Sequence, residues 1–425
     1  MRVRIDGSHQ LYGRVQAPRS KAYTHRALFA SLLSLGQTTI QKPLVSDDTM
    51  RTLDAIREMG ARVRESRDVI VSRGVGVPLP PNVPLDCGES GATLRLLTAI
   101  SSASMGKTVL ITGNGLAKRP IQPLLDALEI IGASTRLDRA EDHLRVTVQG
   151  PLKGGATSID AGISSQFISG LLMAAPLARD EVRITLEGQI ESRPYVEMTL
   201  AIMKQHGILL EETKDSFRIP APQEYRPITH RVPGDFSSAA FLIAAGGTAG
   251  DNITVSGLDR DSTVEPDSVV LELFPQIGID VKEIGGDLLV TKGQLEHFAF
   301  DASDNPDLVP VLEVLAAQAK GRSEIRGVRR LRYKESNRLE TVPEELTKMG
   351  AKVFVKEDKV VIDGSEKLVG ERLSSHHDHR VAMACATAAL AANGQSVIED
   401  AEVVSKSYPA FFNDLERLGA RLDVE

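Results

Sequence analysis

The hydrophobic pattern of this chain repeats six times. In each copy an amphipathic helical pattern ends at a glycine, and a stretch typical of a β-strand follows directly. Successive glycines of this kind are 69 to 75 residues apart. A glycine just past the last helical residue is the usual left-handed C-cap, after which the chain can begin a strand. The pattern therefore predicts six helix–strand junctions, at Gly60, Gly132, Gly207, Gly278, Gly350 and Gly419.

A second helix, apolar on almost every side, precedes each junction. Ser and Asp are good N-caps, and their positions predict that these helices begin 70 to 74 residues apart, near Ser20, Ser90, Ser164, Asp235, Asp307 and Asp378. A helix that is apolar all round belongs inside a core. Each unit is therefore expected to be βαβαββ, with one buried and one amphipathic helix. Units of about 70 residues are longer than the ~20–50 of solenoid repeats, so they indicate packed subdomains.

The two ends of the chain predict how the units are grouped. The last unit stops at "ARLDVE" without its final strand, whereas the chain begins with a spare strand, "MRVRIDG". We expect the N-terminal strand to complete the sixth unit. A chain of 425 residues is too long for one ordinary core. The predicted domains are residues 16–232, and a discontinuous domain of residues 1–15 plus 233–425, with three units each.

Composition excludes several classes of partner. Apolar residues make up 42% and charged residues 25%, as in folded soluble proteins. The net charge of −7 argues against bulk binding to nucleic acid or an anionic membrane, and the absence of Trp argues against a base-stacking platform. Two distant cysteines, Cys87 and Cys385, form neither a disulfide framework nor a zinc site. A cytoplasmic protein without a metal or cofactor is expected.

The starts of the buried helices carry unusual polar side chains. A helix N-terminus suits a phosphate or carboxylate, but cations there oppose the helix dipole. Lys21, His379 and Arg380 therefore need another purpose. If the six starts converge on one cleft, that purpose is to bind a dianionic ligand. The other unusual residues at these starts include Arg26, Gly91, Ser164, Ser165, Gln166 and Asp307.

Three further segments add candidate chemistry. "RYKESNR" (residues 332–338) sets Glu335 among cations, which indicates either surface ion pairs or an anion pocket that contains an acid–base group. "TGNGLAKRP" (112–120) supplies Arg119, and Lys406 precedes "SYPAFF". The four residues "HHDH" (376–379) could bind a metal, but neighbours at a helix start point in different directions.

These segments together carry a resemblance to a known family. The segments, in chain order, are "APRSKAYTHRALFASLL", "DCGESGATLRLL", "KRPIQPLLDAL", "SSQFISGLLMAAPLA", "SRPYVEMTLAIM", "PGDFSSAAFLIAA", "NPDLVPVLEVLA", "LRYKESNRL", "HHDHRVAMACA" and "SKSYPAFF". They resemble the 5-enolpyruvylshikimate-3-phosphate (EPSP) synthases along nearly the whole chain. The resemblance implies a two-lobed inverse α/β barrel, the enolpyruvyl transferase fold. It also implies transfer of the enolpyruvyl group of phosphoenolpyruvate to shikimate 3-phosphate, by a monomer whose lobes close on its substrates.

The resemblance also assigns residues to each substrate. For shikimate 3-phosphate it implies Lys21, Arg26, Ser164, Ser165, Gln166, Ser192, Tyr195, Asp307 and Lys334. For phosphoenolpyruvate it implies Lys21, Gly91, Arg119, Gln166, Arg338, Arg380 and Lys406. The expected catalytic residues are Asp307 as base, Glu335 as acid, and Lys21, His379 and Lys406. The acid and base roles are interchangeable at this stage, because cations would lower the pKa of Glu335 and burial would raise it.

Four residues depart from the family pattern. Ala22 stands where a Ser is usual, and Thr24 is the expected substitute for that hydroxyl. Glu89 replaces an Asn, Ala92 replaces a Thr, and Arg330 occupies a position that often carries Asn. Two alternatives remain: a sister transferase that acts on a UDP-aminosugar, which would need a Gly-x-Lys-Asn motif and a reactive loop cysteine, and a two-lobed anion-binding protein without catalysis.

Overall fold

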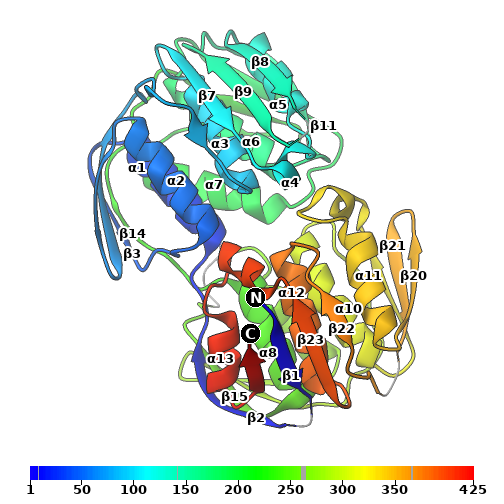
Figure 1. Cartoon of the computed structure of the whole chain (residues 1–425). Coiled ribbons are helices and arrows are strands. Elements are labelled where there is room, and N and C mark those ends of the chain that lie inside the picture. The colour runs from blue at the N-terminus through cyan, green and yellow to red at the C-terminus, as the bar shows by residue number, and fades with distance from the viewer. Residues whose placement is uncertain (8, 141, 260–264, 365–366) are drawn as a thin grey trace. The chain divides into compact units, whose positions relative to one another are not determined.

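The computed structural model describes residues 1–425 except 8, 141, 260–264 and 365–366. The chain divides into two compact units (Figure 1). One is the N-terminal lobe, residues 19–232, and the other is the C-terminal lobe, residues 1–18 with 233–425. The predicted domains had their first boundary after residue 15, whereas the first unit boundary lies after Pro18. The second boundary falls after Val232 in both.

Within the described residues, the strands form six four-stranded sheets of one topology. Across each sheet, the edge strand pairs parallel with its neighbour. The third strand then pairs antiparallel with the second, and the fourth pairs antiparallel with the third. The N-terminal lobe contains β14 (Thr229–Arg231), β3 (Leu35–Gln41), β5 (Val69–Val75) and β4 (Arg62–Ser66); β6 (Leu85–Asp86), β7 (Lys107–Ile111), β9 (Leu144–Gln149) and β8 (Ser134–Arg139); and β10 (Gly155–Asp160), β11 (Val182–Glu187), β13 (Ser216–Ile219) and β12 (Glu211–Glu212).

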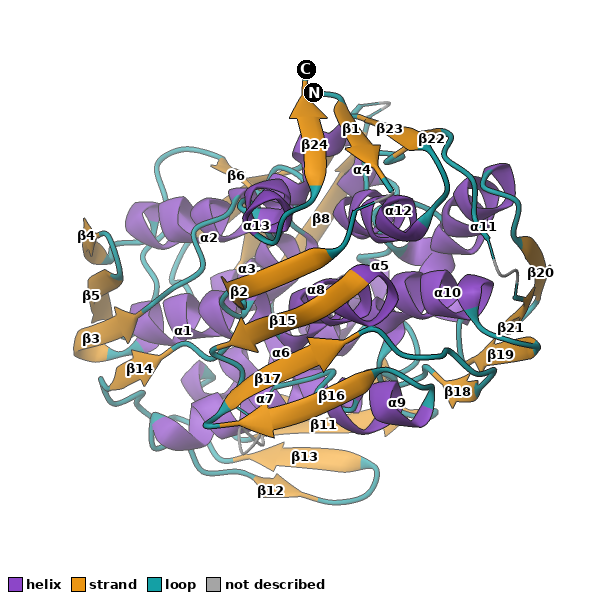
Figure 2. Ribbon diagram, turned by 90° about the horizontal axis from the view of Figure 1, so that it is seen from below, coloured by secondary structure: helices purple, strands orange, loops and turns teal. Residues whose placement is uncertain are grey.

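The C-terminal lobe repeats this topology three times. Its sheets are β2 (Leu11–Gln16), β15 (Gly250–Ser256), β17 (Asp287–Thr291) and β16 (Asp280–Ile284); β18 (Ala299–Asp301), β19 (Arg322–Arg326), β21 (Lys359–Asp363) and β20 (Lys352–Lys356); and β22 (Arg372–Ser374), β23 (Gln395–Glu399), β1 (Val3–Asp6) and β24 (Arg421–Val424). Figure 2 shows the first of these sheets in front of its helix. The predicted βαβαββ unit is therefore present six times.

The apolar helices form the interior of each lobe, as predicted. They are α1 (Lys21–Leu33), α3 (Gly91–Ser101), α6 (Ser165–Ala174), α8 (Phe236–Ala249), α10 (Val309–Gln318) and α12 (His379–Ala391). All 14 residues of α8 are buried. The predicted residues Ser20, Ser90, Ser164, Asp235 and Asp378 are the N-caps of five of these helices, and each side chain accepts a backbone N–H.

The fifth start differs from the prediction. Asp307 lies inside a 3₁₀ turn, η2 (Pro306–Leu308), and α10 begins two residues later with Leu308 at the N-cap position. The Asp307 carboxylate binds Lys334 and Arg338 instead of a backbone N–H. The prediction that Asp307 caps this helix is therefore wrong, because stronger charged partners take its side chain.

The amphipathic helices end as predicted. They are α2 (Asp47–Glu58), α5 (Gln122–Ile130), α7 (Arg193–Gln205), α9 (Val270–Gln276), α11 (Arg338–Lys348) and α13 (Phe411–Arg417). All six predicted junction glycines have positive φ, between 82° and 103°. A side chain there would strain the backbone, so glycine lets each helix stop and the next strand begin.

The N-terminal strand completes the sixth unit, as predicted. β1 pairs antiparallel with β23 on one side and β24 on the other, which brings the two chain ends together (Figures 1 and 2). A second exchange concerns residues 11–15 and 229–231, which the predicted boundaries had placed in the C-terminal and N-terminal lobes without predicting the sheets that they join. β2, which precedes α1, pairs with β15 of the C-terminal lobe, and β14, which precedes α8, pairs with β3 of the N-terminal lobe. Units one and four have thus exchanged their first strands.

A buried carboxylate in the core of the C-terminal lobe predicts a stability change. Glu313 on α10 is fully buried, and neither of its carboxylate oxygens has a hydrogen-bond partner in the described part of the chain. Burial raises its pKa well above the ordinary value. The unfolded chain ionises this group above about pH 4.5, so it destabilises the fold increasingly as pH rises toward the raised pKa.

We therefore expect Glu313→Leu to stabilise the protein by about 1–3 kcal/mol near pH 8, and by less near pH 5. The measurement is the thermal midpoint of unfolding at both pH values. Glu416→Leu, on the exposed face of α13, is the matched control and should give no such gain. A Glu313→Leu gain that is equal at the two pH values, or absent at both, would contradict the expectation.

Candidate functional site

The starts of the three buried helices of the C-terminal lobe meet at the Arg380 side chain. Its Nη1 donates to the backbone oxygens of Ser237, at 3.3 Å, and Asp307, at 3.2 Å. Its Nη2 lies 3.5 Å from the Asp307 carboxylate. Ser237 belongs to the first turn of α8, Asp307 lies just before α10, and Arg380 is in the first turn of α12. Three of the six predicted helix starts thus converge within this lobe.

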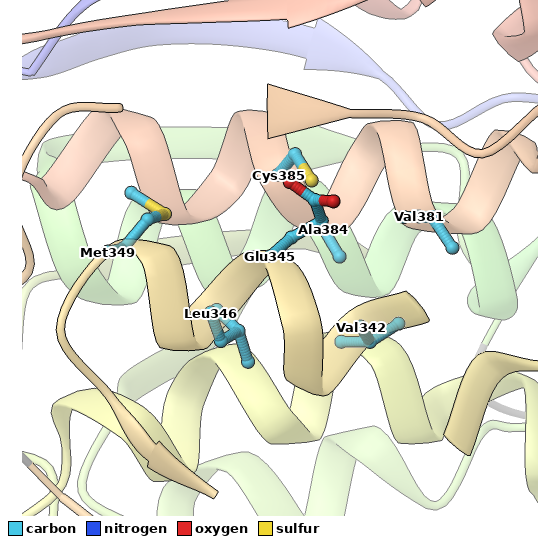
Figure 3. Close-up of a pocket in the computed structure, with 7 residues that line it drawn as sticks. All are labelled: Val342, Glu345, Leu346, Met349, Val381, Ala384 and Cys385. Carbon is cyan, nitrogen blue, oxygen red and sulfur yellow. The ribbon is translucent and has the colours of Figure 1, made fainter. Parts of the chain in front are cut away.

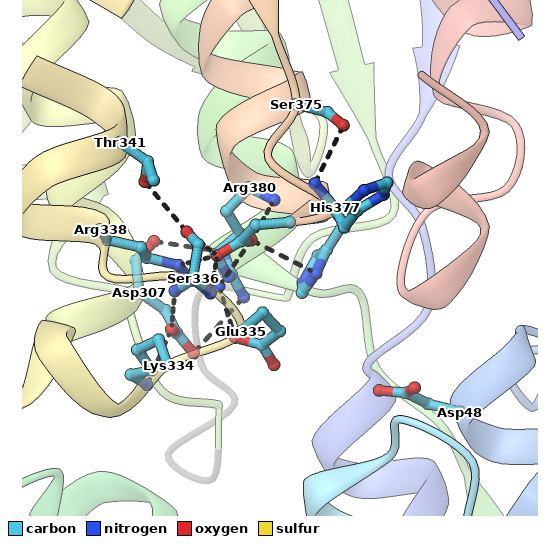
Figure 4. Close-up of polar contacts among 12 residues, drawn as sticks. Asp48, Asp307, Lys334, Glu335, Ser336, Arg338, Thr341, Ser375, His377 and Arg380 are labelled. Carbon is cyan, nitrogen blue, oxygen red and sulfur yellow. Dashed lines mark hydrogen bonds and ion pairs between the residues drawn. The ribbon is translucent and has the colours of Figure 1, made fainter. Parts of the chain in front are cut away.

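Arg338, at the start of α11, is the centre of an ion cluster (Figure 4). Its guanidinium is 1% exposed and binds three carboxylates. Nε and Nη2 donate to the two oxygens of Asp378, at 2.8 and 3.0 Å. Nη1 donates to Asp307 and Nη2 to Glu335, both at 2.9 Å. Burial opposes the charge of Arg338, but the carboxylates outweigh burial and raise the pKa of Arg338.

Asp307 is held by three cations. Its Oδ1 accepts hydrogen bonds from Lys334 Nζ at 3.0 Å and from Arg338, and Arg380 lies beside its Oδ2. Burial would raise the pKa of the Asp307 carboxyl, but Arg380, Lys334 and Arg338 hold it well below its ordinary value. Burial lowers the pKa of Lys334 to about 8, despite the adjacent Asp307. The cluster therefore holds an ionised carboxylate among cations to which anionic ligands could bind.

Asp378 was predicted only as a helix cap, yet it organises the cluster. It is fully buried and accepts hydrogen bonds from Arg338, from the backbone and hydroxyl of Ser336, and from the backbone of Arg380. It thereby joins the segment 334–338 to the start of α12. A signal in the sequence could have revealed this role, because an Asp directly before His-Arg brings a carboxylate to a helix start that also bears cations.

The remaining predicted residues of this lobe lie around α12. His379 is 2% exposed, with its Nδ1 3.7 Å from Asp378. Lys406 is buried at the end of η4 (Ala401–Lys406), which packs against α12. The side chains of "HHDH" diverge, because His376 Nε2 lies 2.6 Å from Glu345 whereas Asp378 binds Arg338.

Two further features of this lobe do not suit an anionic substrate. Glu344, Glu345 and His376 could offer three ligand atoms to a metal ion. However, the ammonium group of Lys348 lies 3.1 Å from Glu344 and 2.8 Å from Glu345, so a cation is already there. A cavity between α11 and α12 is lined mainly by apolar side chains (Figure 3). Its lining residues are Val342, Glu345, Leu346, Met349, Val381, Ala384 and Cys385.

In the N-terminal lobe, Lys21 forms a largely buried ion pair with Asp48. The Nζ–Oδ2 distance is 2.9 Å, and the side chains are 18% and 7% exposed. The backbone oxygen of Asp48 accepts a hydrogen bond from Thr93 Oγ1, at 3.3 Å, so the starts of α1, α2 and α3 meet. Asp48 offsets the cost of a cation at a helix start. It was not predicted, because acidic residues in a first turn are common.

Arg26 is built into the interior of the same lobe. It is 3% exposed, and its guanidinium donates to Thr199 Oγ1 at 2.7 Å, Ser169 Oγ at 3.1 Å, and the backbone oxygens of Ala22 and Tyr195. These bonds join α1 to α6 and α7. Ser192, the N-cap residue of α7, has a positive φ of 56°, a strained conformation of the kind found at functional sites. Ser192 and Tyr195 therefore lie beside the helix start that Arg26 holds.

Predicted residues also lie at the starts of α3 and α6. Arg95 Nη1 donates to Gln166 Oε1 at 2.8 Å, and the Arg95 guanidinium stacks 5.4 Å from the Phe167 ring centre. Ser164 caps α6 by accepting the Gln166 backbone N–H, and Ser165 is buried beside it. A Cβ atom on Gly91 would lie 3.0 Å from Arg119 Nη1, so the guanidinium of Arg119 rests on the first turn of α3.

The structure contradicts one expectation about the residues that depart from the family pattern. Thr24 cannot replace the hydroxyl missing at Ala22, because it is fully buried. Its Oγ1 donates to the Ser20 carbonyl at 2.7 Å and accepts the Leu44 N–H. Arg330 is 9% exposed and is one of the positive charges that lower the pKa of Lys334, after burial and Arg338.

Comparison with known proteins agrees with this fold. A sequence model of the EPSP synthase family, 3-phosphoshikimate 1-carboxyvinyltransferase, matches residues 5–415. Proteins of that name from Methanocella arvoryzae and Methanocorpusculum labreanum are 41% and 39% identical to the chain, covering 100% and 98% of it and the same shares of their own lengths.

Two solved structures share the fold at a TM-score of 0.80. One is an EPSP synthase from Acinetobacter baumannii, at 24% identity, with 100% of both chains covered. The other is the enolpyruvyl transferase NikO from Streptomyces tendae, at 19% identity, with 99% of this chain and 98% of that chain covered.

The fold is therefore the two-lobed fold of the enolpyruvyl transferases. The sequence of the protein narrows this assignment further. The chain belongs to the EPSP synthase family. Among the described helices, none has both the length and the apolar character needed to span a membrane.

Proposed function

We propose that this protein transfers the enolpyruvyl group of phosphoenolpyruvate to the 5-hydroxyl of shikimate 3-phosphate and releases phosphate, a step of chorismate and aromatic amino-acid biosynthesis. The observation that carries the proposal is the buried cluster of Lys334, Glu335, Arg338 and Arg380 around Asp307. It combines charges for polyanionic substrates with two carboxylates for proton transfer. We propose that the protein acts as a monomer.

The proposed substrate contacts follow the family pattern. Shikimate 3-phosphate would bind Lys21, Arg26, Ser164, Ser165, Gln166, Ser192, Tyr195, Asp307 and Lys334. Phosphoenolpyruvate would bind Lys21, Gly91, Arg119, Gln166, Arg338, Arg380 and Lys406. Because the Arg26 guanidinium already donates to four groups within the lobe, it would have to exchange one of these protein partners for the substrate.

The proposed reaction has two steps. In the addition, the 5-hydroxyl oxygen of shikimate 3-phosphate bonds to C2 of phosphoenolpyruvate while Asp307 takes the proton of that hydroxyl. Glu335 gives a proton to C3 of phosphoenolpyruvate. In the elimination, the C2–O bond to phosphate breaks, and Glu335 takes a proton back from the new methyl group. Lys21, Arg119, Arg338, Arg380 and Lys406 would stabilise the charge of the leaving phosphate, with His379 supporting the start of α12.

Substrate binding itself would activate the base. In the ligand-free protein, Lys334, Arg338 and Arg380 hold the pKa of Asp307 well below its ordinary value, although burial opposes them. A carboxylate with so low a pKa is a weak base. Substrate phosphate and carboxylate groups would compete for the same cations, so the pKa of Asp307 should rise when both substrates are present.

Release of phosphate tests the proposal. Phosphoenolpyruvate with shikimate 3-phosphate should give phosphate and the enolpyruvyl ether, whereas a UDP-aminosugar or no acceptor should give none. Release with the UDP-aminosugar would favour the sister transferase, and no release would favour an anion-binding protein. Cys87 argues against the sister transferase, because it is fully buried and burial raises the pKa of its thiol, away from a reactive thiolate.

The low pKa of Lys334 predicts a pH limit for substrate capture. Below about pH 8 its ammonium is charged and can bind a phosphate, and above that pH it becomes neutral. We expect kcat/KM for shikimate 3-phosphate to fall above about pH 8, because this ratio reports the pKa values of the free enzyme. Rates at constant ionic strength between about pH 7 and 10 test this.

Arg330→Asn tests whether Lys334 causes this fall in kcat/KM at high pH. It removes one of the positive charges that lower the pKa of Lys334, so the alkaline limb should move to higher pH. A limb at the same pH in both proteins would assign it to another group.

A further inference from the structure

Glu89 binds the backbone of the loop that leads to Arg119. Its Oε1 accepts the Gly115 N–H at 3.0 Å, and its Oε2 accepts the Leu116 N–H at 2.6 Å. Both donors belong to the short helix α4 (Asn114–Ala117). The Gly113 N–H also donates to the Gly88 carbonyl, at 2.8 Å. The segments 88–89 and 113–116 are therefore joined by three hydrogen bonds.

The glycines of this loop let the carboxylate approach so closely. A Cβ on Gly115 would lie 2.8 Å from Glu89 Oε2, and one on Gly113 would overlap Oε1. Gly113 has φ −76° and ψ 175°, a backbone conformation that alanine adopts freely. The Glu89 carboxylate is thus what makes a side chain at Gly113 unfavourable.

The far end of the loop places Arg119. The Arg119 N–H donates to the Leu116 carbonyl at 3.1 Å, and the Leu116 side chain is fully buried, so Arg119 follows closely on a residue of α4 that is fixed in the interior. The Arg119 guanidinium then rests on Gly91, the first residue of α3, which follows Glu89 by two positions. Glu89 therefore lies next to the surface on which Arg119 rests and holds the loop from which Arg119 extends.

We propose that Glu89 is a positioning residue that holds Arg119 over the first turn of α3 and thereby sets the affinity for phosphoenolpyruvate. This inference rests on the proposed function, in which Arg119 binds that substrate. Glu89 stands where the family usually has Asn, and an amide has one acceptor oxygen, so it could not accept both backbone N–H groups with two separate oxygens.

Glu89→Gln distinguishes positioning from simple charge. Loss of a carboxylate near an anion site would by itself lower KM for phosphoenolpyruvate. Loss of one of two charge-assisted bonds should instead loosen the loop and raise this KM about tenfold, with kcat and KM for shikimate 3-phosphate nearly unchanged. Hydrogen exchange should also become faster at Gly115 and Leu116. Asp86→Asn removes an exposed negative charge three residues earlier, and its side-chain oxygen can still accept the Gly88 N–H as Asp86 does, so it should leave all of these unchanged.

Gly113→Ala provides a second, sharper arm. In the unmodified protein the new methyl group should displace the Glu89 carboxylate and raise KM for phosphoenolpyruvate. In a Glu89→Ala background the same substitution should have no further effect, because the group it displaces is gone. A further control tests whether Glu89 acts through Arg119. In an Arg119→Ala background, Glu89→Gln should not change KM for phosphoenolpyruvate.

The outcomes separate this inference from the proposed function. If the unmodified protein releases no phosphate, the proposed function fails, and hydrogen exchange still tests the loop. If it is active but Glu89→Gln lowers KM for phosphoenolpyruvate or leaves it unchanged, the positioning role is overturned. Equal effects of Gly113→Ala with and without Glu89 would overturn it as well.

Discussion

Replacing Glu335 with glutamine is expected to lower kcat by about a hundredfold or more, while both substrates still bind. Glu335 is 15% exposed and accepts a hydrogen bond from Arg338 at 2.9 Å. The oxygen of a glutamine side chain can accept the same hydrogen bond, so Arg338 should stay in place. What the substitution removes is the proton that the addition step gives to C3 of phosphoenolpyruvate and that the elimination step takes back.

The measurement pairs steady-state rates with isotope exchange. In deuterated water, the unmodified enzyme should incorporate deuterium at C3 of phosphoenolpyruvate when shikimate 3-phosphate is present, and Glu335→Gln should not. Glu340→Gln is the matched control, because Glu340 lies exposed in the first turn of α11, five residues after Glu335. Unchanged turnover, or deuterium incorporation at the normal rate, would remove Glu335 from proton transfer to C3 and return that role to Asp307.

Replacing Asp378 with asparagine is expected to destabilise the protein by about 3–5 kcal/mol, the usual cost of breaking a buried ion pair. Asp378 binds Arg338 through both of its oxygens, at 2.8 and 3.0 Å, and caps α12 through the Arg380 N–H. Asparagine can keep the cap, but its amide group would face the donors of Arg338. The guanidinium should then move, and KM for phosphoenolpyruvate should rise.

Asp235→Asn is the matched control for Asp378→Asn. Asp235 caps the corresponding helix α8 by accepting the Ser238 N–H at 2.9 Å, so its replacement also removes a charge and keeps a cap. The control should leave KM for phosphoenolpyruvate nearly unchanged. Thermal unfolding and substrate titration measure both effects. If Asp378→Asn does not fold, Ser336→Ala, which removes a weaker donor to Asp378, should raise the same KM by a smaller factor. Equal effects of Asp378→Asn and Asp235→Asn would contradict a special role for Asp378.

The repeated architecture could be predicted from the sequence because its signals are local. The positive φ of Gly60 and Gly419 follows from helices that end where the hydrophobic period changes. The caps Ser20 and Asp235 follow from the hydrogen bonds that the first turn of a helix requires. The unpaired first strand and the incomplete last unit together predicted the pairing of β1 with β24. Each of these inferences needs only the chain within one unit, or a count of strands.

The pairing partners of β2 and β14 could not be predicted in this way. The predicted boundaries placed each strand in its lobe, but the local sequences do not say which sheet of that lobe each strand joins. The choice depends on long-range pairing with β15 and β3. The same holds for Thr24, whose hydroxyl was expected at a substrate and instead serves Leu44.

In the candidate site, too, some features could be predicted from the sequence and others only from the tertiary structure. The sequence by itself determined which residues could carry the chemistry, because "KES", "DHR" and "SSQF" are unusual combinations of charge and polarity at helix starts. Only the tertiary structure decided their partners: that Arg338 binds three carboxylates, that Asp307 leaves its helix uncapped to hold Lys334, and that Glu89 turns to the loop of Arg119. The physical reason is that charged side chains pair with whatever opposite charge or donor the packed helices bring within about 3 Å, and that proximity is set by residues tens of positions apart.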